Sequence, residues 1–225
     1  MRAMILAAGL GTRLRPLTLH TPKPLLEVGG RPLIVWHIEA LARAGIKQIV
    51  INTAWLGSKL VEALGDGSYF GIEIFWSHEE EPLETAGGIQ KALPLLGSEP
   101  FILVNGDIWT RFDFAALVNK SLGEDLGYLV LVKNPPQHPN GDFVLHDDGR
   151  ITQTGAEKLT FAGISLLSPK LFNSLPAGKA PLAPILRQAM DAGHISGECL
   201  QNHWVDVGTI ERLLELDQQI SDGIV

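Results

Sequence analysis

Short apolar segments alternate with amphipathic ones through the first 130 or so residues of this 225-residue chain. Short β-branched runs such as Gln48 to Asn52 are typical of buried strands, whereas the apolar spacing from Pro32 to Ala44 is helical. The pattern predicts strands at residues 3–6, 48–52, 72–76, 101–104 and 128–132, with helices at 32–44, 58–64, 86–96 and 114–122. This alternation predicts an α/β fold with a Rossmann-like, mostly parallel sheet and helices on both faces.

The pattern changes in the second half of the chain. In the stretch DFVLHDDGRITQT, the Asp148-Gly149 pair lies between two alternating segments, which is a strong hairpin signal. A further strand is predicted at 161–167 and helices at 182–192 and 210–220. This mixture predicts an antiparallel extension of the same sheet. We see no linker or repeat, so we expect a single domain over residues 1–225.

Composition narrows the class of protein. Hydrophobic residues make up 45% of the chain, enough for a substantial core, and no apolar run reaches the roughly 18 residues that a membrane helix needs. Cys199 is the only cysteine, so neither an internal disulfide nor a cysteine metal cluster can form. A cytoplasmic protein with no membrane partner is the simplest expectation.

The charge is negative overall but unevenly distributed. The formal net charge of −7 disfavours nucleic acid as a partner. Yet residues 1–31 contain five Arg and Lys side chains against Glu27 alone. A small cationic region in an acidic protein suggests a small anionic ligand, and a solvated loop is the alternative.

The loop after the first predicted strand contains two glycines, Gly9 and Gly11, and several of these cations. A glycine-rich loop in this position commonly binds phosphate through backbone N–H groups. The stretch GLGTRLRP does not match the P-loop pattern, and Leu14 occupies the third glycine position of the dinucleotide-binding pattern. The loop therefore does not fully match either of these phosphate-binding motifs.

The stretch LAAGLGTRLRPLTLHTPKPL, residues 6–25, resembles the signature of the sugar-1-phosphate nucleotidyltransferases at nearly every position. The resemblance continues in EPLETAGGI, VNGDI, AEKLTFAGI and WVDVGT, and so covers most of the chain. It implies the nucleotidyltransferase fold, with a nucleotide-binding half at about 1–110 and a sugar-binding half at about 111–225. The implied reaction joins a sugar 1-phosphate to a nucleoside monophosphate and releases pyrophosphate.

The resemblance also implies catalytic roles for Arg13 and Lys23. Both reactants are polyanions, and two unit charges 4 Å apart repel by about 4 kcal/mol at an effective dielectric constant near 20. We therefore expect catalysis by positioning and charge neutralisation. Arg13 is expected at the leaving pyrophosphate and Lys23 at the α-phosphate, whereas Arg15 has a weaker claim and is as well explained by solvent exposure.

Nucleotide-binding residues are expected in two places, the first loop and the stretch from Glu79 to Gly88. Of the glutamates in the second stretch, Glu80 is our choice to accept a hydrogen bond from the base. The family usually has glycine where this chain has Glu84, a departure that bears on the fit of base or sugar. The full expected set is Ala8, Gly9, Gly11, Thr12, Arg13, Lys23, Glu80, Thr85 and Gly88.

A metal site and a sugar-phosphate site complete the expectation. Asp107 follows a predicted strand and Asp206 lies in a similar context, and magnesium prefers few protein ligands, so this pair suits Mg²⁺. Alternatively, each aspartate only caps a turn. The residues expected at the sugar and its phosphate are Asn105, Asn140, Gly141, Glu157 and Lys158, with a surface ion pair as the alternative for the last two.

Within the family, the chain is most similar to the uridylyltransferases that act on N-acetylmuramate 1-phosphate in peptidoglycan recycling. We therefore expect UTP and N-acetylmuramate 1-phosphate as substrates, and a monomer or small homo-oligomer. Guanylyl transfer to mannose 1-phosphate and thymidylyl or uridylyl transfer to glucose 1-phosphate are the closest alternatives. A non-catalytic regulatory subunit and a dinucleotide-binding oxidoreductase are alternatives of other classes.

Overall fold

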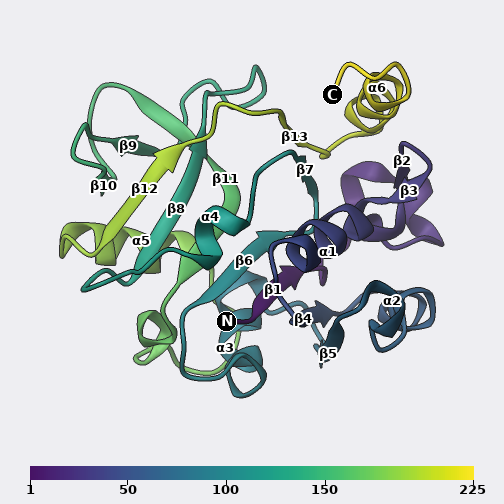
Figure 1. Ribbon diagram of the computed structural model, residues 1–225, viewed down its shortest axis with the longest axis horizontal. Helices are drawn as coiled ribbons and strands as arrows, with labels where there is room; N and C mark the ends of the chain where they lie inside the picture. The colour runs from purple at the N-terminus through teal and green to yellow at the C-terminus, as the bar shows by residue number, and fades with distance from the viewer.

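The computed structural model describes residues 1–225, which form a nine-stranded mixed sheet flanked by helices, together with two small two-stranded sheets (Figure 1). Four parallel strands form one half of the sheet, in the order β5 (Glu73–His78), β4 (Gln48–Thr53), β1 (Ala3–Leu6) and β6 (Phe101–Asn105). The strand beside β6 is β11 (Lys158–Leu167), which runs antiparallel to it. The mostly parallel α/β sheet expected from the sequence is therefore confirmed.

The second half of the chain extends this sheet beyond β11. The strand β8 (Gly127–Val132) pairs antiparallel with β11, and β9 (Phe143–Leu145) and β10 (Ile151–Thr152) form the hairpin predicted around Asp148-Gly149. The outermost strand, β12 (Ile195–Cys199), was not predicted, and it runs parallel to β8. The extension is thus antiparallel, as expected, except at this last strand.

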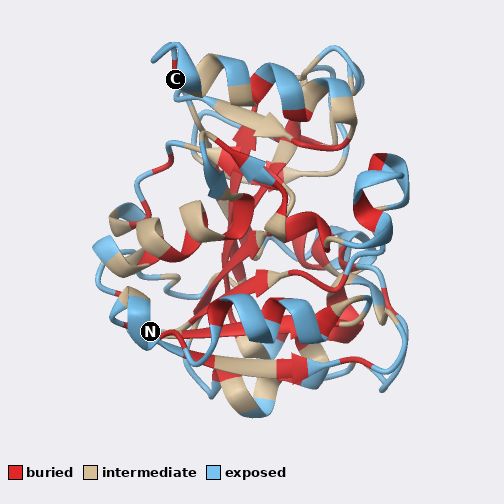
Figure 2. Cartoon of the chain, turned by 90° about the vertical axis from the view of Figure 1, so that its right-hand side faces the viewer, coloured by how far each residue is buried: buried red, intermediate tan, exposed pale blue.

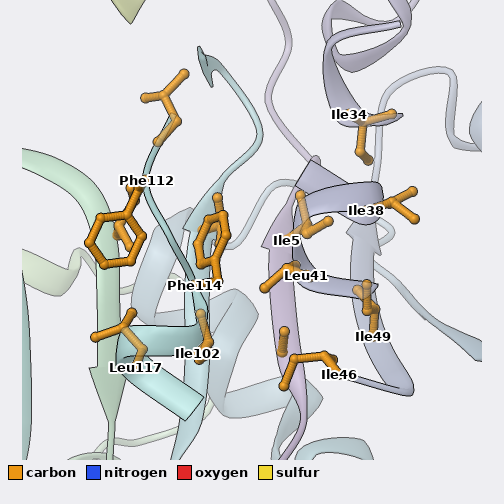
Figure 3. Packing of buried hydrophobic residues seen from close by; sticks show 14 of the residues in the cluster. Ile5, Ile34, Ile38, Leu41, Ile46, Ile49, Ile102, Phe112, Phe114 and Leu117 are labelled. Carbon is orange, nitrogen blue, oxygen red and sulfur yellow. The ribbon is translucent and has the colours of Figure 1, made fainter. Parts of the chain in front are cut away.

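Helices cover both faces of the sheet, each over its own core. On one face, α1 (Leu33–Arg43) packs over strand residues such as Ile5 and Ile49 (Figure 3), and α2 (Gly57–Leu64) adds Leu60 and Leu64 to the same core. On the other face, α3 (Glu84–Leu96) and α5 (Leu182–Asp191) pack over neighbouring residues that point the opposite way, including Met4 and Val50. Alternation along each strand divides the apolar side chains between the two cores. Figure 2 shows the buried strands between helices whose outer faces are exposed.

The helix predicted at 114–122 is shorter than expected. Only α4 (Ala115–Val118) forms, and its buried Leu117 packs with Phe112 and Phe114 in the first core. The following three residues are exposed, so further helical turns would bury no apolar side chain in that stretch. None of the helices is both long enough and apolar enough to cross a membrane.

A third apolar cluster joins the two ends of the chain. The C-terminal helix α6 (Ile210–Ser221) lies beside the small hairpin of β2 (Glu27–Val28) and β3 (Arg31–Pro32) (Figure 1). Leu213 and Leu216 of α6 belong to the same buried cluster as Leu14 and Val28 from the first loop region. The last helix therefore packs against the segment that follows β1 and stabilises its position.

The strand connections place a switch point between β1 and β6. From β1 the chain crosses through α1 to β4 on one side, whereas β6 lies on the other side of β1. In open α/β sheets, ligands bind at the carboxyl ends of strands where the connections diverge in this way. A ligand-binding site is therefore expected at the residues that follow Leu6 and Asn105.

Candidate active site

A cleft of about 250 Å³ opens at this switch point. One side is the end of β1 and β6, and the other side is the segment between β5 and α3. Fourteen residues line it, namely Leu6, Ala7, Ala8, Gly9, Lys23, Pro24, Asn52, Glu79, Pro82, Glu84, Thr85, Asn105, Gly106 and Asp107. Six residues expected at the site from the sequence therefore come together here, namely Ala8, Gly9, Lys23, Thr85, Asn105 and Asp107.

The signature loop, residues 7–26, is compact because it bonds back to itself. Gly11 has a positive φ of 61°, and a Cβ atom there would lie 2.9 Å from the Thr18 Cγ2 methyl. The Thr18 hydroxyl donates to the Gly11 carbonyl at 2.7 Å. Both the backbone conformation and the close contact require glycine at position 11. The loop is thus held in a defined shape beside the cleft.

Lys23 is the loop's cation inside the cleft. Its side chain is 10% exposed, and its ammonium Nζ lies 2.8 Å from Asp107 Oδ2. Arg13, Arg15 and Thr12 are exposed on the loop. Arg13 lies toward the start of α6, because a Cβ atom at Gly208 would be 3.1 Å from its Nη1. The structure therefore brings Lys23, but not Arg13, against the carboxylate at the end of β6.

Asp107 and Asp206 are brought together by two short strands, β7 (Ile108–Thr110) and β13 (Trp204–Asp206). Asp206 pairs directly with Ile108, and the Val207 N–H donates to the Asp107 carbonyl at 2.9 Å. Arg212 of α6 donates to Asp206 Oδ2 at 2.6 Å. A second cleft, of about 220 Å³, is lined by both aspartates and by Asn105.

The two aspartates fit a magnesium ion. Each is held through its Oδ2 atom by a cation from another element, and neither Oδ1 atom has a hydrogen bond or ion pair within the chain. No third His, Cys, Asp or Glu side chain completes a metal-binding cluster with them. Two hard oxygen donors with room for substrate and water oxygens match the preference of Mg²⁺ for few protein ligands.

The opposite end of the cleft contains a buried carboxylate that the sequence did not single out. Glu79 is 1% exposed, and its Oε1 accepts from Asn52 Nδ2 at 2.7 Å while its Oε2 accepts from the Leu83 N–H at 2.9 Å. Asn52 Oδ1 in turn accepts from the Ala7 N–H at 2.8 Å. The only sign of this pair in the sequence is Asn52, a polar residue at the end of the buried run QIVIN. Glu80, the expected base-binding residue, is exposed and does not line the cleft.

Gly88 lies behind this carboxylate in α3. A Cβ atom at Gly88 would be 2.7 Å from Glu79 Oε1 and 3.0 Å from Asn52 Nδ2, so only glycine lets the helix approach the pair this closely. Thr85 and Glu84, at the start of α3, line the cleft itself. The EPLETAGGI stretch therefore contributes Pro82, Glu84 and Thr85 to one wall of the cleft.

The residues expected at the sugar 1-phosphate do not all come together. Asn105 lies at the junction of the two clefts, with Gly163 of β11 against its side chain. Gly141 packs against the backbone of Lys158, where a Cβ atom would lie 2.9 Å from the Lys158 carbonyl oxygen. Asn140 and Glu157 are exposed. Asn140, Gly141, Glu157 and Lys158 line none of the clefts described here.

Comparison with known proteins identifies the family. The model of the family described as nucleotidyl transferase matches residues 2–223. A protein of Neisseria meningitidis named N-acetylmuramate alpha-1-phosphate uridylyltransferase is 50% identical over 96% of each chain. A mannose-1-phosphate guanylyltransferase catalytic subunit beta of Drosophila pseudoobscura is 32% identical over 92% of this chain and 59% of its own.

Solved structures share the fold. A putative glucose-1-phosphate thymidylyltransferase from Bacillus anthracis, crystallised with sucrose, matches with a TM-score of 0.86, at 23% identity over 99% of this chain and 96% of that one. The HddC protein from Yersinia pseudotuberculosis, complexed with GMP-PN, matches with a TM-score of 0.81, at 22% identity over 97% and 99%. With the family model matching nearly every residue and a relative 50% identical along almost its whole length, the chain belongs to the nucleotidyl transferase family.

Proposed function

We propose that this enzyme transfers UMP from UTP to N-acetylmuramate 1-phosphate, giving UDP-N-acetylmuramate and pyrophosphate, in the recycling of peptidoglycan. The observation that carries the proposal is the 50% identity, over 96% of each chain, to the Neisseria protein that bears this activity in its name. The cleft at the switch point of the sheet supports it, since Lys23 and residues of the glycine-containing signature loop, Ala8 and Gly9, line the space. The earlier alternative of a dinucleotide-binding oxidoreductase loses its support with the family assignment.

In the proposed reaction, an oxygen of the sugar 1-phosphate attacks the α-phosphorus of UTP. The bond from that phosphorus to the bridging oxygen breaks, and pyrophosphate leaves. The nucleophile is already an anion, so no side chain has to remove a proton. The remaining task is to hold two polyanions together. Lys23 is proposed at the α-phosphate, and Arg13 at the leaving pyrophosphate, reached by movement of its exposed side chain.

Mg²⁺ is the proposed cofactor, held by Asp107 and Asp206, and when bound it supplies positive charge to the phosphate oxygens. Lys23 and Arg212 each fix one oxygen of these carboxylates and leave the other free. The nucleotide is proposed to lie in the first cleft, with its base toward Glu79 and Thr85. Glu79 replaces Glu80 in this proposal because Glu79 lines the cleft and Glu80 does not. Ala8, Gly9, Gly11, Thr12 and Gly88 complete the proposed nucleotide site.

The sugar phosphate is proposed to lie in the second cleft, which Asn105 and the two aspartates border. This assignment divides the chain into a nucleotide-binding half at about 1–110 and a sugar-binding half at about 111–225. Asn140, Gly141, Glu157 and Lys158 remain proposed contacts to the sugar and its phosphate. A cytoplasmic monomer or small homo-oligomer is the proposed form of the enzyme.

Guanylyl transfer to mannose 1-phosphate is the second candidate, favoured by the 32% identity to the Drosophila protein of that name. Cleft charge does not separate the two, because guanine donates from N1–H and its amino group where uracil donates from N3–H. A non-catalytic subunit is disfavoured by the presence of Lys23 and both aspartates.

The test is a pyrophosphate-release assay with UTP, dTTP and GTP against N-acetylmuramate, glucose and mannose 1-phosphates, in magnesium. Leaving a buried polar group unpaired costs about 1–3 kcal/mol, so we expect kcat/KM for UTP with N-acetylmuramate 1-phosphate to lead by roughly 10- to 100-fold or more. Mass spectrometry of the product identifies the nucleotide sugar. A clear lead for GTP with mannose 1-phosphate, or dTTP with glucose 1-phosphate, would overturn the proposed substrates.

A further inference from the structure

Glu84 combines a disfavoured backbone conformation with a place at the proposed nucleotide cleft. Its φ is +60°, and the only other non-glycine residue with positive φ is Leu56. Glycine is the residue that adopts this conformation freely, and a non-glycine residue there costs stability. Glu84 also lines the first cleft, at the first residue of α3. A strained residue at a cleft calls for a functional reason.

The Glu84 carboxylate differs from the other carboxylates of the cleft in having no partner. Both oxygens of Glu79 accept hydrogen bonds from within the chain, and Asp107 is paired with Lys23. No hydrogen bond or ion pair engages Glu84, whereas the neighbouring Glu81, outside the cleft, has Lys179 at 3.8 Å. Glu84 is thus the one cleft carboxylate whose full accepting capacity is free for a ligand.

Charge decides which part of a nucleotide such a carboxylate can meet. A carboxylate 4 Å from a phosphate oxygen would be repelled by about 4 kcal/mol at an effective dielectric constant near 20. The proposed phosphate end of the cleft, with Lys23 and Asp107, lies at β6, whereas Glu84 belongs to the wall that also contains Glu79 and Thr85. The Glu84 carboxylate therefore suits the uncharged nucleoside.

We propose that Glu84 is a specificity-determining residue whose carboxylate accepts a hydrogen bond from a donor on the nucleoside. The proposal rests on the proposed function, since it takes the first cleft as the nucleotide site. A pyrimidine nucleoside offers two kinds of donor, the N3–H of the base and the ribose hydroxyls. Both would be recognised by the same carboxylate chemistry, and nucleotide analogues separate them.

The experiment measures binding by calorimetry, in magnesium, for the wild type, Glu84→Gly, Glu84→Gln and the control Glu81→Gln. The nucleotides are UTP, 2′-deoxy-UTP, 3′-deoxy-UTP and N3-methyl-UTP. Glu84→Gly relieves the backbone conformation, so we expect it to fold with a raised Tm. A charge-assisted hydrogen bond lost on substitution should weaken UTP binding by roughly 10- to 100-fold in Glu84→Gly, and less in Glu84→Gln.

In the wild type, the analogue that lacks the recognised donor should bind more weakly than UTP. In Glu84→Gly, that analogue and UTP should bind with equal affinity. Loss of discrimination against N3-methyl-UTP assigns the base, and loss against 2′-deoxy-UTP or 3′-deoxy-UTP assigns the ribose hydroxyl that the analogue lacks. Unchanged UTP affinity and unchanged discrimination in Glu84→Gly, beside a raised Tm, would overturn the proposal. If the wild type binds UTP but transfers no UMP, the proposed function is overturned and the proposal for Glu84 is not. If the wild type binds no nucleotide, both proposals are overturned.

Discussion

The ammonium of Lys23 lies 2.8 Å from Asp107 Oδ2 and so joins the signature loop to the end of β6. The two residues are 84 positions apart in the sequence. A similar contact holds the second aspartate, where Arg212 of the last helix donates to Asp206 Oδ2. Each carboxylate is thus oriented by a cation from a distant element, which leaves one oxygen of each available.

The first prediction concerns these carboxylates. Asp107→Asn or Asp206→Asn should lower kcat by at least about 10²-fold, because negative charge at the proposed metal site is lost. Both aspartates are partly exposed at strand ends, so the variants should keep the far-ultraviolet circular dichroism of the wild type. Titrating magnesium back after chelation measures the metal requirement. Full activity of either variant, or of the wild type in excess chelator, would refute the assignment.

The second prediction ranks the cations of the loop. Lys23→Ala should lower kcat by roughly 10²-fold or more, because its charge matters most when both phosphates approach. Arg15→Ala is the matched control, since Arg15 lies on the same loop but is exposed and does not line the cleft. Steady-state kinetics on both variants gives the comparison. Equal losses would show that the ranking of the two residues is wrong.

Most of the fold could be predicted because hydrophobic periodicity depends on local sequence alone. The parallel strands read as short buried runs and the helices as amphipathic segments. β12 was missed because Gly197 and Glu198 interrupt its apolar pattern. Its place is set by tertiary packing, since Gly197 lies so close to the Leu129 carbonyl that a Cβ atom would not fit. Such a contact leaves no signal in a single sequence.

Site residues that belong to a sequence motif could be predicted, whereas a site residue distinguished only by its burial could not. Lys23 and Asp107 lie in the stretches that resemble the family, and the structure brings them into contact. Glutamates 79, 80 and 81 look alike in sequence, yet only Glu79 is buried. What distinguishes it is Asn52 on the neighbouring strand, a partner that the order of residues does not reveal.

The third prediction concerns Glu79. In Glu79→Gln, one terminal atom becomes an NH₂ group, which cannot accept from Asn52 Nδ2 or the Leu83 N–H. One donor is left unpaired, at a cost of about 1–3 kcal/mol, unless Asn52 turns and gives up its bond to the Ala7 N–H. We expect a lower Tm and a raised KM for UTP. Glu80→Gln, at the exposed neighbour, should change neither, and a matching loss in Glu80→Gln would return the base-binding role to that residue.

The fourth prediction concerns the pH dependence of stability. His37 is 2% exposed and its Nε2 donates to the Ile108 carbonyl at 2.8 Å, and burial lowers the pKa of its imidazole from 6.5 to about 4. Between about pH 4 and 6.5, the His37 imidazole is therefore neutral in the folded state but protonated in the unfolded chain. The resulting contribution to stability is fully present above about pH 6.5 and falls by about 3 kcal/mol as the pH drops through 4. Urea unfolding at several pH values measures it. His37→Gln keeps a donor for Ile108 but does not titrate, so its stability should fall less steeply over this range, and parallel curves would exclude His37 as the cause.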